Sequence, residues 1–78
     1  MYKVYAIKSK NRNYIYVGLT SNLEERLQRH NSGREKTTRT YWPFELIYLE
    51  DQPTREEARK REKYLKSGVG KEFLKKIK

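Results

Sequence analysis

The sequence predicts an α+β domain of order ββαβαα, in which a three-stranded, mostly antiparallel sheet is flanked by helices. Hydrophobic and polar residues alternate in two neighbouring stretches near the N-terminus, and two capping patterns open runs in which apolar residues have helical spacing. Length is the third observation, since 78 residues suffice for one small core and not for two. We therefore expect residues 1–78 to form a single domain.

The first two elements are predicted to form a β-hairpin. Residues 2–9 show the period-2 alternation of a strand. A polar turn at residues 10–13 leads into an aromatic and β-branched run at residues 14–18, which suits a second strand. We expect Gly18 to end that strand.

A helix is predicted to follow the hairpin. Ser21 with Glu24, or Asn22 with Glu25, has the spacing of a capping box at a helix start. Glycine commonly ends a helix because it adopts the left-handed conformation of the C-terminal cap. We expect this helix to end at Gly33.

The middle of the chain is predicted to be a loop followed by the third strand. Residues 34–43 have no apolar period and are rich in hydroxyl groups and cations, as in an exposed loop. Residues 44–50 are apolar on both sides, which is typical of a strand covered on both faces.

Two helices are predicted after the third strand. Thr54 and Glu57 form a second capping box, which opens a helix that we expect to run to Ser67 and to stop at Gly68. Residues 71–77 place apolar side chains on one side of a short final helix.

Charge and composition narrow the function classes. The chain has 19 Lys and Arg against 10 Asp and Glu, a formal net charge of +9 at pH 7, which attracts polyanions. Nucleic acid is the commonest such partner, and no helix carries the bulky apolar face of a membrane-surface helix. The absence of cysteine excludes a disulfide framework and a thiolate zinc site. Without a long apolar stretch or a signal-peptide pattern, we expect a soluble, cytoplasmic protein.

One acidic residue stands where packing favours an apolar one. On the helix opened by Thr54, the inward line is Ala58, Glu62 and Leu65. Burying an unpaired carboxylate costs several kcal/mol, so we expect a cation, a metal ion or strong donors beside Glu62. Two interpretations of Glu62 stay open at this point. One is an ion pair with Arg26, Arg61 or another cation, and the other is a metal site.

Four more residues carry a structural and a chemical interpretation. Tyr5 and Tyr16 oppose each other across the hairpin, and tyrosines in strands are usually packing residues. Arg26 lies on the inner edge of the first helix, where it either covers the core with its stem or clamps a phosphate. His30 at the end of that helix interacts well with the helix dipole when protonated and is also suited to proton transfer.

Together these residues resemble a known family. The chain has Lys3-Val4-Tyr5, then Tyr16-Val17-Gly18, Arg26 and His30, and Glu62 on the next helix. This arrangement is similar to the GIY-YIG nuclease domain, above all to the small stand-alone bacterial members that resemble the nuclease domain of the bacterial repair excinuclease. The further motifs that carry the resemblance are residues 16–20, 30–33 and 58–66.

The resemblance implies a catalytic site. Tyr5 and Tyr16 would flank the reacting phosphate, with Tyr16 as general base, and Arg26 would stabilise the phosphate. His30 would share in proton transfer. Glu62 would be the single protein ligand of one Mg²⁺ or Mn²⁺ ion, which fits the habit of Mg²⁺ to bind through one or two carboxylates and to keep several waters.

The sequence also departs from the family pattern. Lys3 replaces the first glycine of the first triplet, and Leu19 stands where the excinuclease-like domain has a lysine. The asparagine that some family nucleases carry downstream is missing after Asn31.

The predicted function is therefore a metal-dependent DNA endonuclease with low sequence specificity, directed by DNA structure in repair or processing. The alternative is a catalytically silent, basic nucleic-acid-binding module. RNA as a partner and a protein that targets the domain stay open, the sequence does not indicate the oligomeric state, and no membrane partner is expected. The side chains predicted to contact nucleic acid are Lys3, Arg26, Arg34, Lys36, Arg39, Lys66 and Lys71.

Overall fold

The computed structural model describes residues 1–77 and confirms the α+β fold of order ββαβαα. Lys78, the last residue of the predicted domain, lies outside the described residues. The elements are β1 (Tyr2–Ser9), β2 (Ile15–Thr20), α1 (Leu23–Asn31), the short 3₁₀ helix η1 (Arg39–Tyr41), β3 (Phe44–Gln52), α2 (Arg55–Lys66) and α3 (Gly68–Lys76). No helix among residues 1–77 is long and apolar enough to span a membrane.

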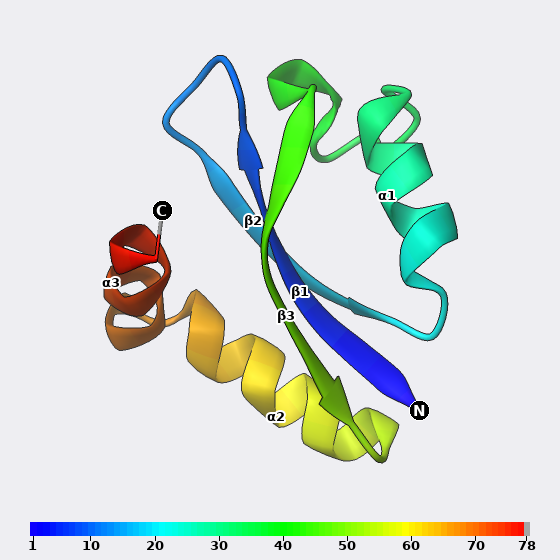
Figure 1. Ribbon diagram of the computed structural model, residues 1–78, viewed down its shortest axis with the longest axis vertical. Coiled ribbons are helices and arrows are strands. Elements are labelled where there is room, and N and C mark those ends of the chain that lie inside the picture. The colour runs from blue at the N-terminus through cyan, green and yellow to red at the C-terminus, as the bar shows by residue number, and fades with distance from the viewer. Residues whose placement is uncertain (78) are drawn as a thin grey trace.

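The sheet has the strand order β2-β1-β3, and both strand pairs are antiparallel. Helix α1 covers one face of the sheet, and α2 and α3 cover the other (Figure 1). The alternation in β1 divides its side chains between these faces: Val4 and Ala6 belong to the core beneath α2 and α3, whereas Tyr5 and Ile7 belong to the second core. The predicted alternation of β1 is therefore confirmed, and Tyr5 lies on the α1 face.

The third strand was expected to be covered on both faces, and this prediction is wrong. β3 is an edge strand that pairs with β1 alone, and Leu46 and Leu49 are 40% and 42% exposed. The central and most buried strand is β1, because it has a partner on each side. An apolar run in the sequence does not show whether a strand is central or at the edge of a sheet. Edge strands also carry apolar residues, because single exposed leucines are tolerated on a protein surface.

Two predicted boundaries at glycines are also wrong. β2 continues through Gly18 to Thr20, and Gly18 pairs with Tyr5 inside the ladder. α3 begins at Gly68 rather than at residue 71, because the Ser67 side chain accepts a hydrogen bond from the Gly70 backbone N–H at 3.3 Å and caps the helix. In both places the glycine lies within an element, where sequence reasoning expected an end.

The capping predictions hold. Of the two candidates for α1, Asn22 is the cap, and its side-chain oxygen accepts a hydrogen bond from the Glu25 backbone N–H at 3.2 Å. Thr54 accepts the corresponding hydrogen bond from Glu57 at 3.2 Å and opens α2. These caps stabilise the first turn of each helix because they satisfy backbone donors that have no partner within the helix.

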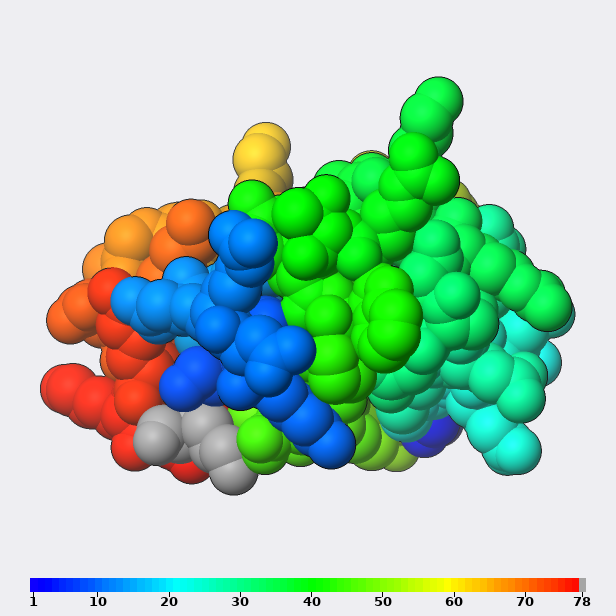
Figure 2. All heavy atoms as spheres, turned by 90° about the horizontal axis from the view of Figure 1, so that it is seen from above, coloured from blue at the N-terminus to red at the C-terminus, as the bar shows by residue number. Residues whose placement is uncertain are grey.

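The segment between α1 and β3 is not the exposed loop that was expected throughout. It contains η1, and Thr38 at the start of η1 is fully buried. The segment lies between the β1–β2 turn and α1 (Figures 1 and 2). Backbone and ring contacts fix it there: Pro43 accepts a hydrogen bond from the Lys10 N–H at 2.9 Å, and the rings of Tyr14 and Tyr41 stack with centroids 3.9 Å apart.

Candidate active site

Two tyrosines from neighbouring strands meet on the α1 face of the sheet. The ring centroids of Tyr5 and Tyr16 are 6.4 Å apart. Tyr5 is fully buried, whereas Tyr16 is only partly buried. The structure therefore brings the predicted pair together and gives its members different access to solvent.

His30 lies beside both tyrosines at the end of α1. Its side chain is buried, with Nε2 2.9 Å from the Tyr5 hydroxyl oxygen and Nδ1 2.9 Å from the Thr38 hydroxyl oxygen. The Tyr16 ring lies 5.0 Å and the Phe44 ring 5.9 Å from the imidazole, measured between centroids. Hydrogen bonds and ring contacts thus hold the imidazole in one orientation.

Burial determines the charge states of this buried pair. It raises the pKa of Tyr5 well above the ordinary value, the neighbouring Tyr16 raises it further, and the positive charge of Arg26 opposes this shift. Burial also lowers the pKa of His30, although Glu35 acts in the opposite direction. At neutral pH Tyr5 is therefore a protonated phenol and His30 a neutral imidazole.

Arg26 reaches this cluster from α1. Its guanidinium lies next to the Tyr5 hydroxyl, and its Nε atom is 3.8 Å from a carboxylate oxygen of Glu35. The Nε atom is buried and has no hydrogen-bond partner among the described residues. Since the side chain is 34% exposed, part of the guanidinium faces solvent beside the tyrosines and is free to bind an anion there.

Glu62 approaches from α2, on the opposite face of the sheet. Its side chain is 17% exposed, as the inward position predicted, and it pairs with Lys66 at 3.3 Å. Neither of the two arginines named from the sequence is its partner, because Arg61 binds Glu50 and Arg26 lies near Glu35. Lys66 lies between Glu62 and Tyr16, since its Nζ atom pairs with Glu62 and is 6.0 Å from the Tyr16 ring centroid.

The Glu62 carboxylate fits the chemistry of one Mg²⁺ or Mn²⁺ ion held by a single protein ligand. Residues 1–77 contain no group of three or more acidic or histidine side chains arranged to hold a metal ion. Mg²⁺ does not need such a cage, because it keeps several waters and takes further oxygens from substrate phosphates. The partly exposed Glu62 carboxylate is a hard oxygen ligand of this kind, and Lys66 is its competitor.

The cations predicted to contact nucleic acid do not form one cluster. Lys3 is engaged in an ion pair with Asp51. Lys66 and Lys71 border a hollow along β2, which is lined by Tyr14, Ile15, Tyr16, Val17, Lys66 and Lys71. This hollow gives a polyanion access to the exposed side of Tyr16.

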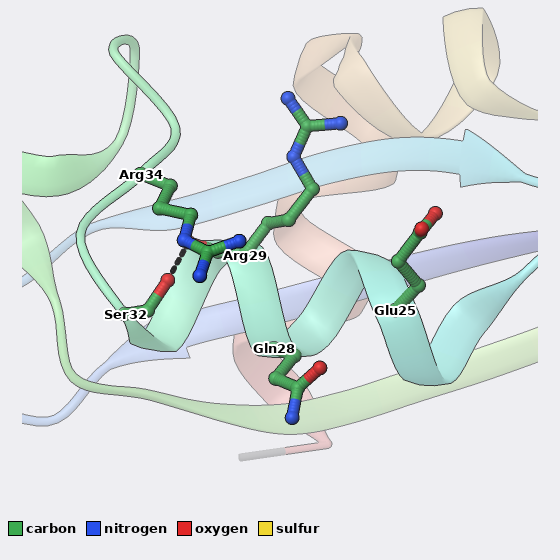
Figure 3. A pocket seen from close by; sticks show the side chains of 5 residues that line it. All are labelled: Glu25, Gln28, Arg29, Ser32 and Arg34. Carbon is green, nitrogen blue, oxygen red and sulfur yellow. Dashed lines mark hydrogen bonds between the residues drawn. The ribbon is translucent and has the colours of Figure 1, made fainter.

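The remaining predicted cations lie on the other side of the cluster, in or near the segment after α1. Lys36 and Arg39 are exposed there. Arg34 lines a second hollow on the outward face of α1, together with Glu25, Gln28, Arg29 and Ser32 (Figure 3). None of the predicted catalytic residues lines this second hollow, so its part in binding stays a prediction.

Two residues of the site were missed from the sequence. Glu35 forms an ion pair with Arg29 at 3.2 Å and lies near Arg26, and Thr38 binds His30. Glu35 is the single acid in the cationic stretch 34–43, which is a weak signal. Thr38 gave no signal, because hydroxyl residues without an apolar period indicate a loop.

The chain matches one family model and is similar to several small bacterial proteins. The family model described as the GIY-YIG catalytic domain matches residues 1–77. The UPF0213 protein of Staphylococcus haemolyticus is 39% identical over 75 residues, which cover 95% of this chain and 90% of that protein. The UPF0213 protein of Clostridium perfringens is 42% identical over 64 residues, which cover 81% of this chain and 68% of that protein.

A solved structure has a similar fold. The solution NMR structure of a UPF0213 protein from Bacillus halodurans superposes with a TM-score of 0.58 at 34% sequence identity, covering 100% of this chain and 86% of that one.

Proposed function

Because this chain belongs to the GIY-YIG catalytic domain family, we propose that it is a divalent-metal-dependent endonuclease that hydrolyses phosphodiester bonds in DNA with low sequence specificity. The observation that supports the proposal best is the buried hydrogen bond between Tyr5 and His30, with Tyr16 and Arg26 beside it. A buried polar pair of this kind costs desolvation energy and is a poor choice for packing alone.

The reaction requires a base for the attacking water, a clamp on the phosphate and stabilisation of the leaving oxygen. Tyr16 is the proposed base because it is the tyrosine with access to solvent, and the Lys66 ammonium lies over its ring, 6.0 Å from the ring centroid. The exposed part of the Arg26 guanidinium donates to the phosphate oxygens. A Mg²⁺ or Mn²⁺ ion bound to Glu62 supplies charge neutralisation at the leaving oxygen.

Tyr5 and His30 have a different role in the proposal. Tyr5 is held as a protonated phenol between the Arg26 guanidinium and the neutral His30 imidazole. Its hydroxyl therefore orients Arg26, which holds the phosphate next to Tyr16, and His30 acts through Tyr5.

A nicking assay tests the proposal. Supercoiled plasmid is incubated with the protein and Mg²⁺ or Mn²⁺, with and without a chelator, and Tyr16→Phe is the matched inactive variant. We expect nicked product that depends on metal and on Tyr16. Product that persists in the chelator, or equal rates in both proteins, would contradict it. Single-stranded DNA, duplex, branched DNA and RNA offered side by side identify the substrate.

The alternative function is a catalytically silent module that binds nucleic acid. The pairing of Glu62 with Lys66 favours it, because the carboxylate is already neutralised by a cation of the same chain. This alternative predicts salt-dependent DNA binding that is the same with and without metal, and no nicked product under any metal condition.

A further inference from the structure

We propose that Thr38 is a positioning residue for His30: its hydroxyl oxygen accepts a hydrogen bond from Nδ1–H, which keeps Nε2 unprotonated and directed at the Tyr5 hydroxyl. This inference rests on the proposed function, where Tyr5 orients the Arg26 guanidinium that binds the phosphate. It starts from two distances, 2.9 Å between Thr38 Oγ1 and His30 Nδ1 and 2.9 Å between His30 Nε2 and the Tyr5 oxygen.

Burial makes this chain of three groups selective for one arrangement of protons. Tyr5 and Thr38 are 0% exposed and His30 is 1% exposed, so bulk water does not satisfy their polar atoms. A buried donor or acceptor without a partner is unfavourable, and the protons must therefore be distributed so that every hydrogen bond has one donor and one acceptor.

Arg26 favours one of the two possible distributions. Its guanidinium has donors only and is close enough to the Tyr5 oxygen to act against the rise in the Tyr5 pKa, so we take that oxygen as an acceptor on this side. The Tyr5 proton then needs an acceptor of its own, and His30 Nε2 is the atom within hydrogen-bond distance. Since a neutral imidazole has one N–H, the proton lies on Nδ1, and Thr38 Oγ1 accepts it.

The backbone holds Thr38 in place for this task. Its N–H donates to the Glu35 carbonyl at 3.1 Å, and its carbonyl accepts from the Tyr41 N–H at 2.9 Å. The chain reverses just before this segment at Gly33, whose φ of 76° lies in the left-handed region that favours glycine. The turn after α1 therefore returns the chain to the end of its own helix and sets Thr38 beside His30.

The tautomer of His30 can be read directly, because His30 is the single histidine of the chain. A long-range ¹H–¹⁵N spectrum of the labelled protein distinguishes a protonated Nδ1 from a protonated Nε2. The proposal expects protonated Nδ1 in the parental protein. Protonated Nε2 in that spectrum overturns the proposal, whether or not the protein cleaves DNA.

Three variants then test the part played by the hydroxyl. Thr38→Val keeps the shape and removes the acceptor, so we expect the tautomer signals to move toward protonated Nε2 and nicking to fall about 10- to 100-fold. Thr38→Ser keeps the hydroxyl and should retain the parental tautomer and most of the rate. Thr37→Val, at an exposed neighbouring position, is the matched control and should behave as the parental protein.

A folded Thr38→Val protein with the parental tautomer and rate overturns the proposal. If Thr38→Val does not fold, the spectra of the parental protein and of Thr38→Ser test the proposal. Protonated Nε2 in either spectrum contradicts it. The two proposals can also fail separately. If the parental protein has the Nδ1–H tautomer and Thr38→Val loses it, the positioning role stands. If the parental protein then never nicks DNA with metal, the nuclease function alone is overturned.

Discussion

Gly18 lies opposite Tyr5 in the antiparallel β1–β2 pair, and a Cβ atom at Gly18 would stand 2.6 Å from the Tyr5 hydroxyl oxygen. The same atom would be 2.8 Å from Tyr5 Cζ and 3.1 Å from Cε2 of Tyr16. The backbone of Gly18 does not adopt a positive φ, so conformational freedom is not the reason for glycine here. The reason is space, because the Tyr5 phenol lies over the place where a side chain would begin.

Gly18→Ala should therefore displace the Tyr5 phenol and break its hydrogen bond to His30. We expect a loss of about 1 to 3 kcal/mol in the free energy of unfolding, typical of overpacking in a core, together with a strong loss of nicking. Gly68→Ala is the matched control, since nothing lies within 4 Å of a Cβ atom there, and it should be neutral or slightly stabilising. Equal melting temperatures for the parental protein and Gly18→Ala would contradict this account.

Tyr5→Phe and Tyr16→Phe should both lose nicking activity, but only Tyr5→Phe should lower the free energy of unfolding. Tyr5→Phe leaves the buried Nε2 of His30 without a donor, which costs about 1 to 3 kcal/mol. Tyr16→Phe removes a hydroxyl from a partly exposed ring and should leave the melting temperature nearly unchanged while abolishing cleavage. Thermal unfolding and plasmid nicking measured on both variants check this. Full activity of Tyr16→Phe would exclude its role as base.

Glu62→Gln should abolish nicking and leave the fold intact. Glu62 and Lys66 are one helical turn apart, and the Lys66 side chain is 50% exposed. Loss of this ion pair should therefore lower the free energy of unfolding by only about 0.5 kcal/mol. DNA binding without metal should hold or tighten, because a negative charge near the phosphate is removed. Glu72→Gln, which breaks an exposed helical pair with Lys75, is the control and should keep full activity. A large fall in melting temperature for Glu62→Gln would identify a structural ion pair instead.

Acid should destabilise the protein through Glu50. Hydrogen bonds from Arg61 at 2.8 and 3.0 Å, with Tyr48 and Gln52 as further donors, lower the pKa of Glu50 to about 2. Because the folded-state pKa lies below the unfolded value of 4.5, this stabilisation is present above pH 4.5 and is lost as the pH falls toward 2. Because solvent screens the 39% exposed Arg61 side chain, the contribution at pH 7 is about 1 to 2 kcal/mol, less than the full pKa shift would give.

Denaturant unfolding of the parental protein and Glu50→Gln at several pH values measures this contribution. The gap between the two proteins should be widest at pH 5 and above and should close as the pH approaches 2. A gap that is constant with pH would show that the Glu50 charge is not what the network stabilises.

Binding to DNA should weaken steeply with salt. A net charge of +9 on one small domain favours release of counterions from the phosphate backbone, and four or five phosphate contacts give a slope of log K against log salt of about −4. Lys71→Ala, which removes an exposed cation at the hollow along β2, should reduce the slope by about 1 without changing the fold. A slope near zero for the parental protein would remove nucleic acid as the partner.

The sequence by itself determined the order of the strands and α-helices and the two faces of β1. The alternation in residues 2–9 placed Tyr5 on one face of the sheet and Val4 on the other, and the capping patterns at Asn22 and Thr54 located two helix starts. These features are local, because a period or a cap depends on residues only a few positions apart.

The tertiary structure alone decided the polar partners that come from separate elements. Glu62 faces inward as predicted and meets Lys66, whose i,i+4 spacing within α2 is present in the sequence, whereas the acid near Arg26 is Glu35 from the segment after α1. Thr38 reaches His30 because a turn at Gly33 brings the segment back to α1. No period or spacing encodes such contacts, since they depend on the reach of long side chains and on where separate elements come to lie in space.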